Sequence, residues 1–164
     1  SLHLAEKLEG TGMVDARDVS WKKVDQILEN KKRIGLHNLE AKLQDATILD
    51  PESVDLADIV IADVPCSGLG VISKKVDIKY KMTPEKIKEI VILQRQILEV
   101  AGTYVKANGF LVYSTCTINR EENQENVQWF LQKFPDFECC FEEQILPIDG
   151  KQDGFFISKL EKKG

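Results

Sequence analysis

The chain has 164 residues, the length of one ordinary globular domain. It is 43% hydrophobic and 30% charged, which is typical of a soluble globular protein and excludes a disordered, collagen-like or disulfide-knotted chain. Its apolar runs are far shorter than the roughly 18 residues of a membrane helix, and no basic leader with an apolar segment opens it. The net charge of −5 argues against a broadly basic nucleic-acid-binding surface but not against a local basic patch.

The cysteine pattern predicts free thiols. None of the four cysteines is spaced as C-x-x-C, and with two histidines in the chain a closed zinc site is not expected. Four thiols without an export signal predict a reducing, cytoplasmic location. Because the chain starts with Ser1 inside an apparent helix, we expect it to be a fragment.

The first third of the chain predicts helix alternating with strand. A helix is expected over 1–9 and a strand over 13–18. A second helix should begin after Ser20 as N-cap and end at Gly35, followed by a strand over 39–45.

The pattern continues with a nearly continuous apolar strand over 57–62, of the kind that suits a parallel strand covered on both faces. The longest helix is expected from Pro84 to about Asn108, and a strand over 110–113 follows. Asn119 and Glu122 resemble a capping box that starts the next helix. A final strand over 154–158 should be antiparallel.

This alternation predicts an open, mostly parallel α/β sheet. Ligands of such sheets bind beyond the carboxyl ends of the strands. Four chemically capable residues fall at predicted strand ends, so we expect them to converge on one functional edge: Asp18, Asp45, Asp63 and Cys116.

Two of these acids suit a nucleoside-containing cofactor. An aspartate at the end of the second strand of a Rossmann-like unit commonly binds ribose hydroxyls, which matches Asp18, and Asp45 one strand later could hold an adenine amino group. Alternatively each caps the turn that follows it, which is the commoner role of an aspartate at a strand end.

Residues 63–70 (DVPCSGLG) form the most specific motif. The proline stiffens the turn, the glycines allow close backbone approach, and Cys66 is presented between them. A buried structural cysteine is the alternative interpretation. Cys116 ends the neighbouring predicted strand, and two thiols beside the Asp63 carboxylate suit covalent catalysis on a pyrimidine.

Residues 63–70 and 113–118 (YSTCTI), with 119–122 (NREE) and 153–157 (DGFFI), resemble the RNA cytosine-5 methyltransferases that use S-adenosylmethionine. The likeness is strongest to the bacterial methyltransferase B (Sun/Fmu) group, which modifies 16S ribosomal RNA, and it covers nearly the whole chain. It implies a Rossmann-like class I methyltransferase fold, rRNA processing as the process, and methylation of cytosine C5 through a covalent cysteine–C6 intermediate, without a metal.

The resemblance also implies residue roles. Cys116 matches the nucleophile and Cys66 the cysteine that helps to release the product, although related DNA enzymes attack with the Pro-Cys cysteine instead. Asp63 matches the acid that contacts cofactor and target base, and Asp18 and Asp45 match the cofactor's ribose and adenine contacts.

Part of the family's pattern is missing. The glycine-rich cofactor loop, the first strand and the N-terminal RNA-binding regions should precede Ser1. We therefore expect residues 1–164 to be a single, truncated catalytic domain that is inactive alone.

A basic segment follows the Cys66 loop. Residues 71–90 hold six lysines and three acids, a charge of +3, which leaves −8 on the rest of the chain. Lys74, Lys75 and Lys79 could bind RNA phosphates, or the segment could be a solvated surface.

Two other functions remain open. An amino-group methyltransferase would favour an Asx-Pro-Pro-aromatic loop, which residues 63–66 do not match. A non-catalytic RNA-binding module would not require thiols at two strand ends.

Overall fold

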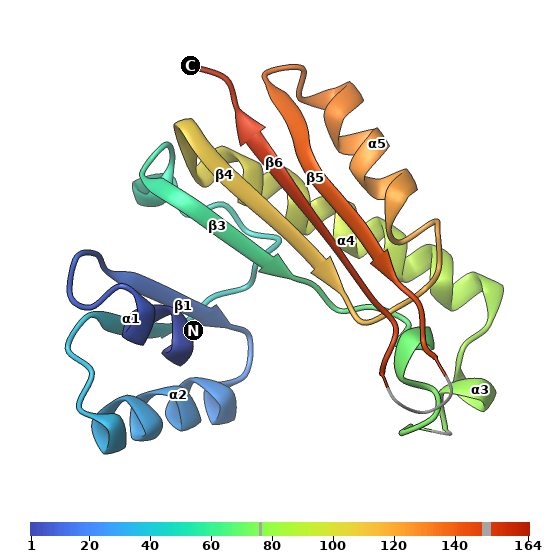
Figure 1. Cartoon of the computed structure of the whole chain (residues 1–164), viewed down its shortest axis with the longest axis horizontal. Helices are drawn as coiled ribbons and strands as arrows, with labels where there is room; N and C mark the ends of the chain where they lie inside the picture. The colour runs from blue at the N-terminus through green and yellow to red at the C-terminus, as the bar shows by residue number, and fades with distance from the viewer. Residues whose placement is uncertain (76, 149–151) are drawn as a thin grey trace. The chain divides into compact units, whose positions relative to one another are not determined.

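The computed structural model describes residues 1–75, 77–148 and 152–164, and of Lys79 it describes the backbone alone. These residues form two compact units, 1–49 and 50–164, and each is described by itself. Their elements are shown in Figure 1. The prediction of one domain over 1–164 stays a prediction. Among the described residues, no helix combines the length and the apolarity that a membrane crossing requires.

The first unit is a small parallel βαβ arrangement. Strands β1 (Val14–Asp18) and β2 (Leu39–Leu43) pair in parallel. Helix α2 (Trp21–Ile34) connects them, and α1 (Leu2–Lys7) precedes both. Gly35 ends α2 with a φ of 79°, as its position after the helical pattern predicts. A small core of Ala5, Ala16 and Leu39 holds this unit together.

The second unit contains a four-stranded mixed sheet in the order β3-β4-β6-β5. Strand β3 (Ala57–Asp63) pairs in parallel with β4 (Val105–Thr115). Strand β6 (Phe155–Lys162) runs antiparallel to both β4 and β5 (Phe137–Ile145), so the predicted antiparallel last strand is confirmed.

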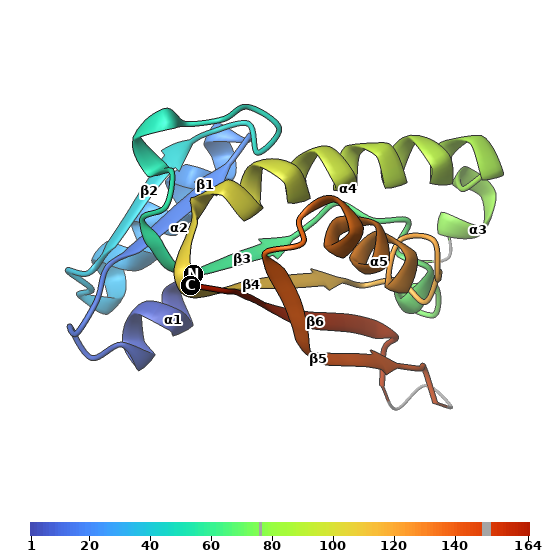
Figure 2. The same ribbon diagram turned by 90° about the horizontal axis from the view of Figure 1, so that it is seen from above.

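Two helices cover one face of this sheet, α4 (Pro84–Tyr104) and α5 (Gln124–Lys133), as Figure 2 shows. Fully buried Leu98, Leu111, Phe130, Phe156 and Leu160 form the centre of the core between helices and sheet. Three short helical segments lie in the connections: η1 (Pro51–Ser53), η2 (Leu69–Val71) and α3 (Ile78–Lys81).

Several element boundaries differ from those that the sequence predicts. Helix α4 ends at Tyr104, because Val105 is extended and already pairs with Ala57 of β3. Helix α5 starts at Gln124, after the Asn119–Glu122 pair that resembled a capping box. Strand β5 was not predicted, because its mostly exposed, acidic sequence lacks a clear apolar alternation and the strand depends on pairing with β6.

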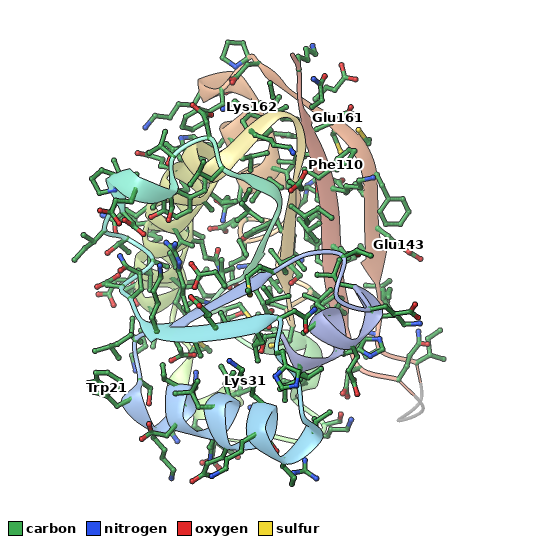
Figure 3. The ribbon with its side chains drawn as sticks, turned by 90° about the vertical axis from the view of Figure 1, so that its left-hand side faces the viewer. Trp21, Lys31, Phe110, Glu143, Glu161 and Lys162 are labelled. Carbon is green, nitrogen blue, oxygen red and sulfur yellow. The ribbon has the colours of Figure 1, made fainter. Side chains whose placement is uncertain are left out.

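The expectation that β3 is covered on both faces is wrong for these residues. Ile59 and Ile61 are 58% and 46% exposed. They lie opposite the face that packs on α4, as do Phe110 of β4 and its β6 partner Glu161, which are labelled in Figure 3. The sheet thus presents a partly apolar outer face.

Candidate active site

The two cysteines that end neighbouring strands lie side by side. Strands β3 and β4 run in parallel with Asp63 opposite Ser114, so the segments that follow them leave the sheet at the same edge. The Sγ atoms of Cys66 and Cys116 are 3.2 Å apart, and both side chains are partly exposed. The expectation that Cys66 and Cys116 lie together at the ends of neighbouring strands is therefore confirmed.

The environment of Cys66 favours the neutral thiol. Burial, together with the neighbouring Cys116 thiol, raises the pKa of Cys66 to about 12. At neutral pH Cys66 therefore keeps its proton and can donate a hydrogen bond to the sulfur of Cys116. Since the nucleophilic species is the thiolate, the raised pKa disfavours Cys66 for the attack.

Asp63 lies at the same edge, three residues before Cys66. Its side chain is exposed, and Oδ1 accepts a hydrogen bond of 3.3 Å from Ser114 Oγ. The carboxylate is thus oriented from β4 while it stays accessible to a ligand.

A close backbone approach holds the cysteine segments together. The Gly70 N–H donates to Cys116 O at 3.1 Å, and Gly154 N–H donates to Gly70 O at 2.7 Å. A Cβ atom on Gly70 would lie 2.8 Å from Cys116 O and collide with the Gly154 carbonyl. Glycine is required here because three backbone segments meet.

A buried carboxylate connects the two segments, and sequence reasoning did not identify this role. Glu122 is fully buried. Its Oε2 accepts the Ser67 N–H at 2.8 Å and Gln94 Nε2 at 3.0 Å, and its Oε1 accepts Ser67 Oγ at 2.5 Å and Asn119 Nδ2 at 3.1 Å. Its spacing from Asn119 suggested only a helix cap, because sequence carries no signal for burial of a single acid.

The two aspartates of the first unit form local turns. Asp18 Oδ1 accepts the Ser20 N–H at 2.9 Å, and Oδ2 lies 3.2 Å from Lys23 Nζ. Asp45 Oδ1 accepts the Thr47 N–H and hydroxyl, which lower the pKa of Asp45. The turn-forming alternative is therefore realised. Each carboxylate oxygen has two lone pairs, so both side chains can still accept hydrogen bonds from ribose hydroxyls or an amino group.

The lysines that follow the Cys66 loop differ in their surroundings. Lys74 Nζ forms an ion pair with Asp153 at 2.6 Å, which partly neutralises its charge. Lys75 is exposed. Both line a shallow cavity of about 570 Å³ together with Lys81 and Met82. The side chain of the third predicted RNA contact, Lys79, lies outside the described residues.

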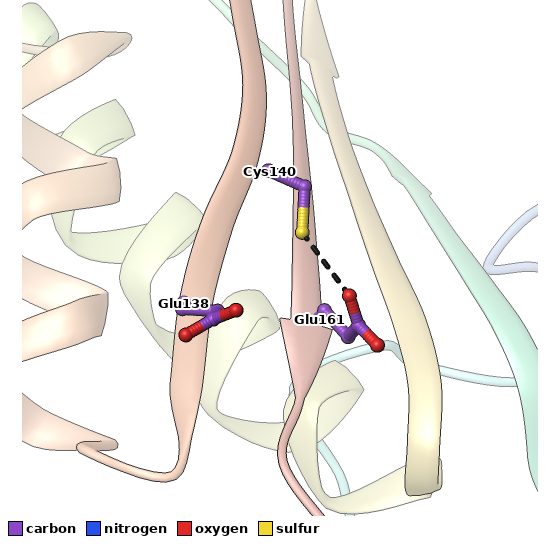
Figure 4. Close-up of side chains that lie close together, drawn as sticks. All are labelled: Glu138, Cys140 and Glu161. Carbon is purple, nitrogen blue, oxygen red and sulfur yellow. Dashed lines mark hydrogen bonds between the residues drawn. The ribbon is translucent and has the colours of Figure 1, made fainter.

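The remaining cysteines lie on β5, and both are exposed. Cys140 Sγ is 3.3 Å from Glu161 Oε2, and Glu138 lies beside them (Figure 4). Desolvation and Glu161 raise the pKa of the Cys140 thiol. We assign no role to this cluster.

The chain is similar to known proteins over its whole length. The model of the family described as "16S rRNA methyltransferase RsmB/F" matches residues 1–161. A relative from Bacillus subtilis (strain 168), a probable ribosomal RNA small subunit methyltransferase B, is 37% identical over 182 residues, which cover 100% of this chain and 41% of the relative. The chain spans about two fifths of the length of such relatives.

Solved structures show the same fold. The structure of NSun6 from Pyrococcus horikoshii with SFG superposes with a TM-score of 0.82 at 29% identity, covering 99% of this chain and 44% of that one. A SAM-dependent methyltransferase from Aquifex aeolicus superposes with a TM-score of 0.63 at 15% identity, covering 98% and 74%, a likeness of fold alone. The chain therefore belongs to the 16S rRNA methyltransferase RsmB/F family, with the Rossmann-like fold of the methyltransferases that use S-adenosylmethionine.

Proposed function

We propose that this chain carries the catalytic residues of an S-adenosylmethionine-dependent methyltransferase that acts on C5 of a cytosine in 16S ribosomal RNA. The observation that carries the proposal is the pair of thiols 3.2 Å apart at the carboxyl ends of β3 and β4. Methylation of an amino group needs no thiol, whereas C5 of cytosine is a poor nucleophile until a group adds at C6.

Cys116 is the proposed nucleophile. The Cys116 thiol loses its proton to solvent and the thiolate adds to C6. Asp63, which is exposed at the same strand end, hydrogen-bonds the ring at N3 and relays a proton from solvent to it. The electrons of the C5–C6 double bond then make C5 nucleophilic. S-adenosylmethionine would supply the electrophilic methyl group to C5 and leave as S-adenosylhomocysteine, and Asp18, Asp45 and Asp63 are the proposed residues that bind it.

Release requires the reverse of the addition. A solvent base takes the C5 proton, its electrons re-form the C5–C6 double bond, the bond between Cys116 and C6 breaks, and the N3 proton returns to solvent through Asp63. The Cys66 thiol retains its proton, since its pKa is raised to about 12, and it lies within hydrogen-bonding distance of the departing sulfur. Cys66 thereby assists elimination.

RNA is the proposed partner, in the cytoplasm where ribosomal RNA is processed. Lys75 and Lys74 are proposed to contact phosphates beside the cysteine segments, and Lys79 is retained from the sequence as a third candidate. The target base has to be unstacked, because its ring face is closed inside a helix.

The test uses the complete natural polypeptide that contains these residues, with S-adenosylmethionine and unmethylated 16S ribosomal RNA. We expect Cys66→Ala to accumulate a covalent protein–RNA adduct on a denaturing gel, and Cys116→Ala to form none and to lack activity. The reverse pattern would assign the attack to Cys66. Intact methylation by both variants without any adduct would exclude the covalent mechanism.

A further inference from the structure

We infer that Glu122 is a positioning residue that keeps the Cys66 and Cys116 Sγ atoms at their short separation of 3.2 Å. The inference extends the proposed function, because it concerns the same thiol pair. Glu122 touches neither thiol. It binds both hydrogen-bonding groups of Ser67, the residue directly after Cys66: the backbone N–H at 2.8 Å and the hydroxyl at 2.5 Å.

The connection reaches the second cysteine through a hydroxyl pair. Ser67 Oγ lies 2.8 Å from Thr117 Oγ1, and Thr117 directly follows Cys116. Because the Ser67 hydroxyl donates its proton to the Glu122 carboxylate, the Thr117 hydroxyl donates to Ser67. One carboxylate thus fixes the residues next to both thiols, and all three side chains are buried.

The hydrogen-bond directions around Glu122 are determined from a residue that can only donate. Arg95 Nε donates to Asn126 Oδ1 at 2.8 Å, so the Asn126 amide nitrogen faces Gln94 Oε1, also at 2.8 Å. Gln94 Nε2 therefore points at Glu122 Oε2 and at Pro65 O, the residue before Cys66, at 2.9 Å. Cys66 is flanked on both sides by this network.

Four donors converge on the two oxygens of Glu122, and a carboxylate is the side-chain group that accepts all of them. In Glu122→Gln an NH₂ group would face two donors at nearly unchanged volume. A buried polar group left without a partner is costly. The Ser67 and Gln94 side chains should therefore move away from residue 122, and the separation of the two thiols should change.

The experiment tests whether the two thiols lie close enough to be bridged, with phenylarsine oxide, a reagent that binds two neighbouring thiols. The complete natural polypeptide carries Cys139→Ser and Cys140→Ser to remove the exposed adjacent pair. We expect the reference protein to bind one reagent molecule across Cys66 and Cys116, and Glu122→Gln to bind it about tenfold more weakly, as the loss of about one hydrogen bond's free energy implies.

Leu160→Ala is the matched control. It creates a cavity in the core without removing a hydrogen bond of the network. Even if its Tm falls as far as that of Glu122→Gln, Leu160→Ala should bind the reagent as tightly as the reference protein. Glu122→Gln that binds the reagent as tightly as the reference, or Leu160→Ala that weakens it equally, would overturn the inference.

Thr117→Val keeps the test decisive if Glu122→Gln does not fold. It removes the hydroxyl that connects Ser67 to the Cys116 segment and that also accepts the Asn119 N–H at 3.2 Å. We expect a severalfold weaker binding of the reagent. Unchanged binding in this variant would also overturn the inference. With RNA, Glu122→Gln should lower kcat with little change in KM for RNA. The absence of a Cys116 adduct with RNA would refute the proposed mechanism but not the role of Glu122, because the reagent assay requires no catalysis.

Discussion

At the scale of single residues, two thiols of the same chemical type have different surroundings. Cys66 is held against Cys116 in a partly buried position, and burial is the main cause of its raised pKa. A buried thiol resists ionisation because the charged form loses solvation. The proposed division of roles between the two cysteines thus depends on burial and contacts rather than on residue type.

Cys66 should therefore react slowly with alkylating reagents at ordinary pH. In the native chain we expect iodoacetamide to modify Cys66 about 100-fold more slowly than exposed Cys139 at pH 8, with the Cys66 rate rising as pH approaches 12. Peptide mapping by mass spectrometry distinguishes the sites. Equal rates at pH 8 would contradict the burial argument.

The same shift has a consequence for stability. An unfolded cysteine has a pKa of about 8.5, below the folded value of about 12. The folded state therefore binds the proton more tightly, and this contribution is complete below pH 8.5 and is lost as pH rises toward 12. The free energy of unfolding should fall less steeply over this range in Cys66→Ala. Burial also raises the pKa of Tyr113, so only the difference between the two curves reports Cys66. Urea denaturation at a series of pH values measures the free energy of unfolding. The same dependence of that free energy on pH in the two proteins would contradict the assignment.

At the scale of elements, the site depends on segments that leave β3 and β4 at one edge and are then packed together. The contact at Gly70 joins the Cys66 loop, the Cys116 segment and the start of β6 through backbone atoms alone. Backbone atoms cannot adjust as a flexible side chain can, so an added methyl group has to displace a whole segment.

Gly70→Ala should destabilise the protein by about 2 kcal/mol or more, by overpacking against Cys116 O and the Gly154 carbonyl. Urea denaturation measures the change. Gly12→Ala is a suitable control, because its added Cβ would lie at an ordinary 3.6 Å from Leu8 Cδ1. An equal, small effect of both substitutions would show that the three segments are not rigidly packed.

Helix α5 is anchored by one aromatic residue. Phe130 is fully buried, stacks on Phe134 with ring centroids 4.6 Å apart, and meets Phe137 edge-on at 5.1 Å. Phe130→Ala should cost about 3–5 kcal/mol of unfolding free energy, whereas exposed Gln128→Ala should cost little. A loss below about 1 kcal/mol for Phe130→Ala would mean that α5 is not essential to the core.

At the scale of the whole molecule, charge is distributed unevenly. Residues 71–90 carry +3 on a chain of −5. Contacts with phosphates release counterions, so such a segment would make RNA binding dependent on salt. Within it, exposed Lys75 differs from Lys74, whose ammonium group lies 2.6 Å from Asp153.

Lys75→Ala should therefore weaken RNA binding and reduce the slope of log K against log salt by about 1. Lys74→Ala should have a smaller effect, because Asp153 already pairs with Lys74. Filter binding of the complete polypeptide over a range of salt concentrations measures both slopes. Lys32→Ala, on exposed α2, is the control, and a reduction as large as that of Lys75→Ala would show that the effect is general charge.

Much of the architecture could be read from local pattern. Apolar periodicity identified α2 and α4, because burial of one face imposes a regular repeat on a helix. A nearly continuous apolar run identified the strand that ends at Asp63. Strand β5 lacks that repeat, and its existence depends on hydrogen bonds to β6, a partner that follows it in the chain. The start of α5 also shifted, because the Glu122 side chain binds the Ser67 segment rather than a helix terminus.

The sequence by itself determined the chemistry that the site can offer: two cysteines and an aspartate at the ends of parallel strands, in motifs specific enough to indicate their family. The tertiary structure alone decided how these groups are placed. The 3.2 Å separation of the thiols, the raised pKa of Cys66 and the burial of Glu122 depend on residues about 50 positions apart in the chain. Distance and desolvation are properties of packed neighbours, and a linear pattern does not specify which distant groups become neighbours.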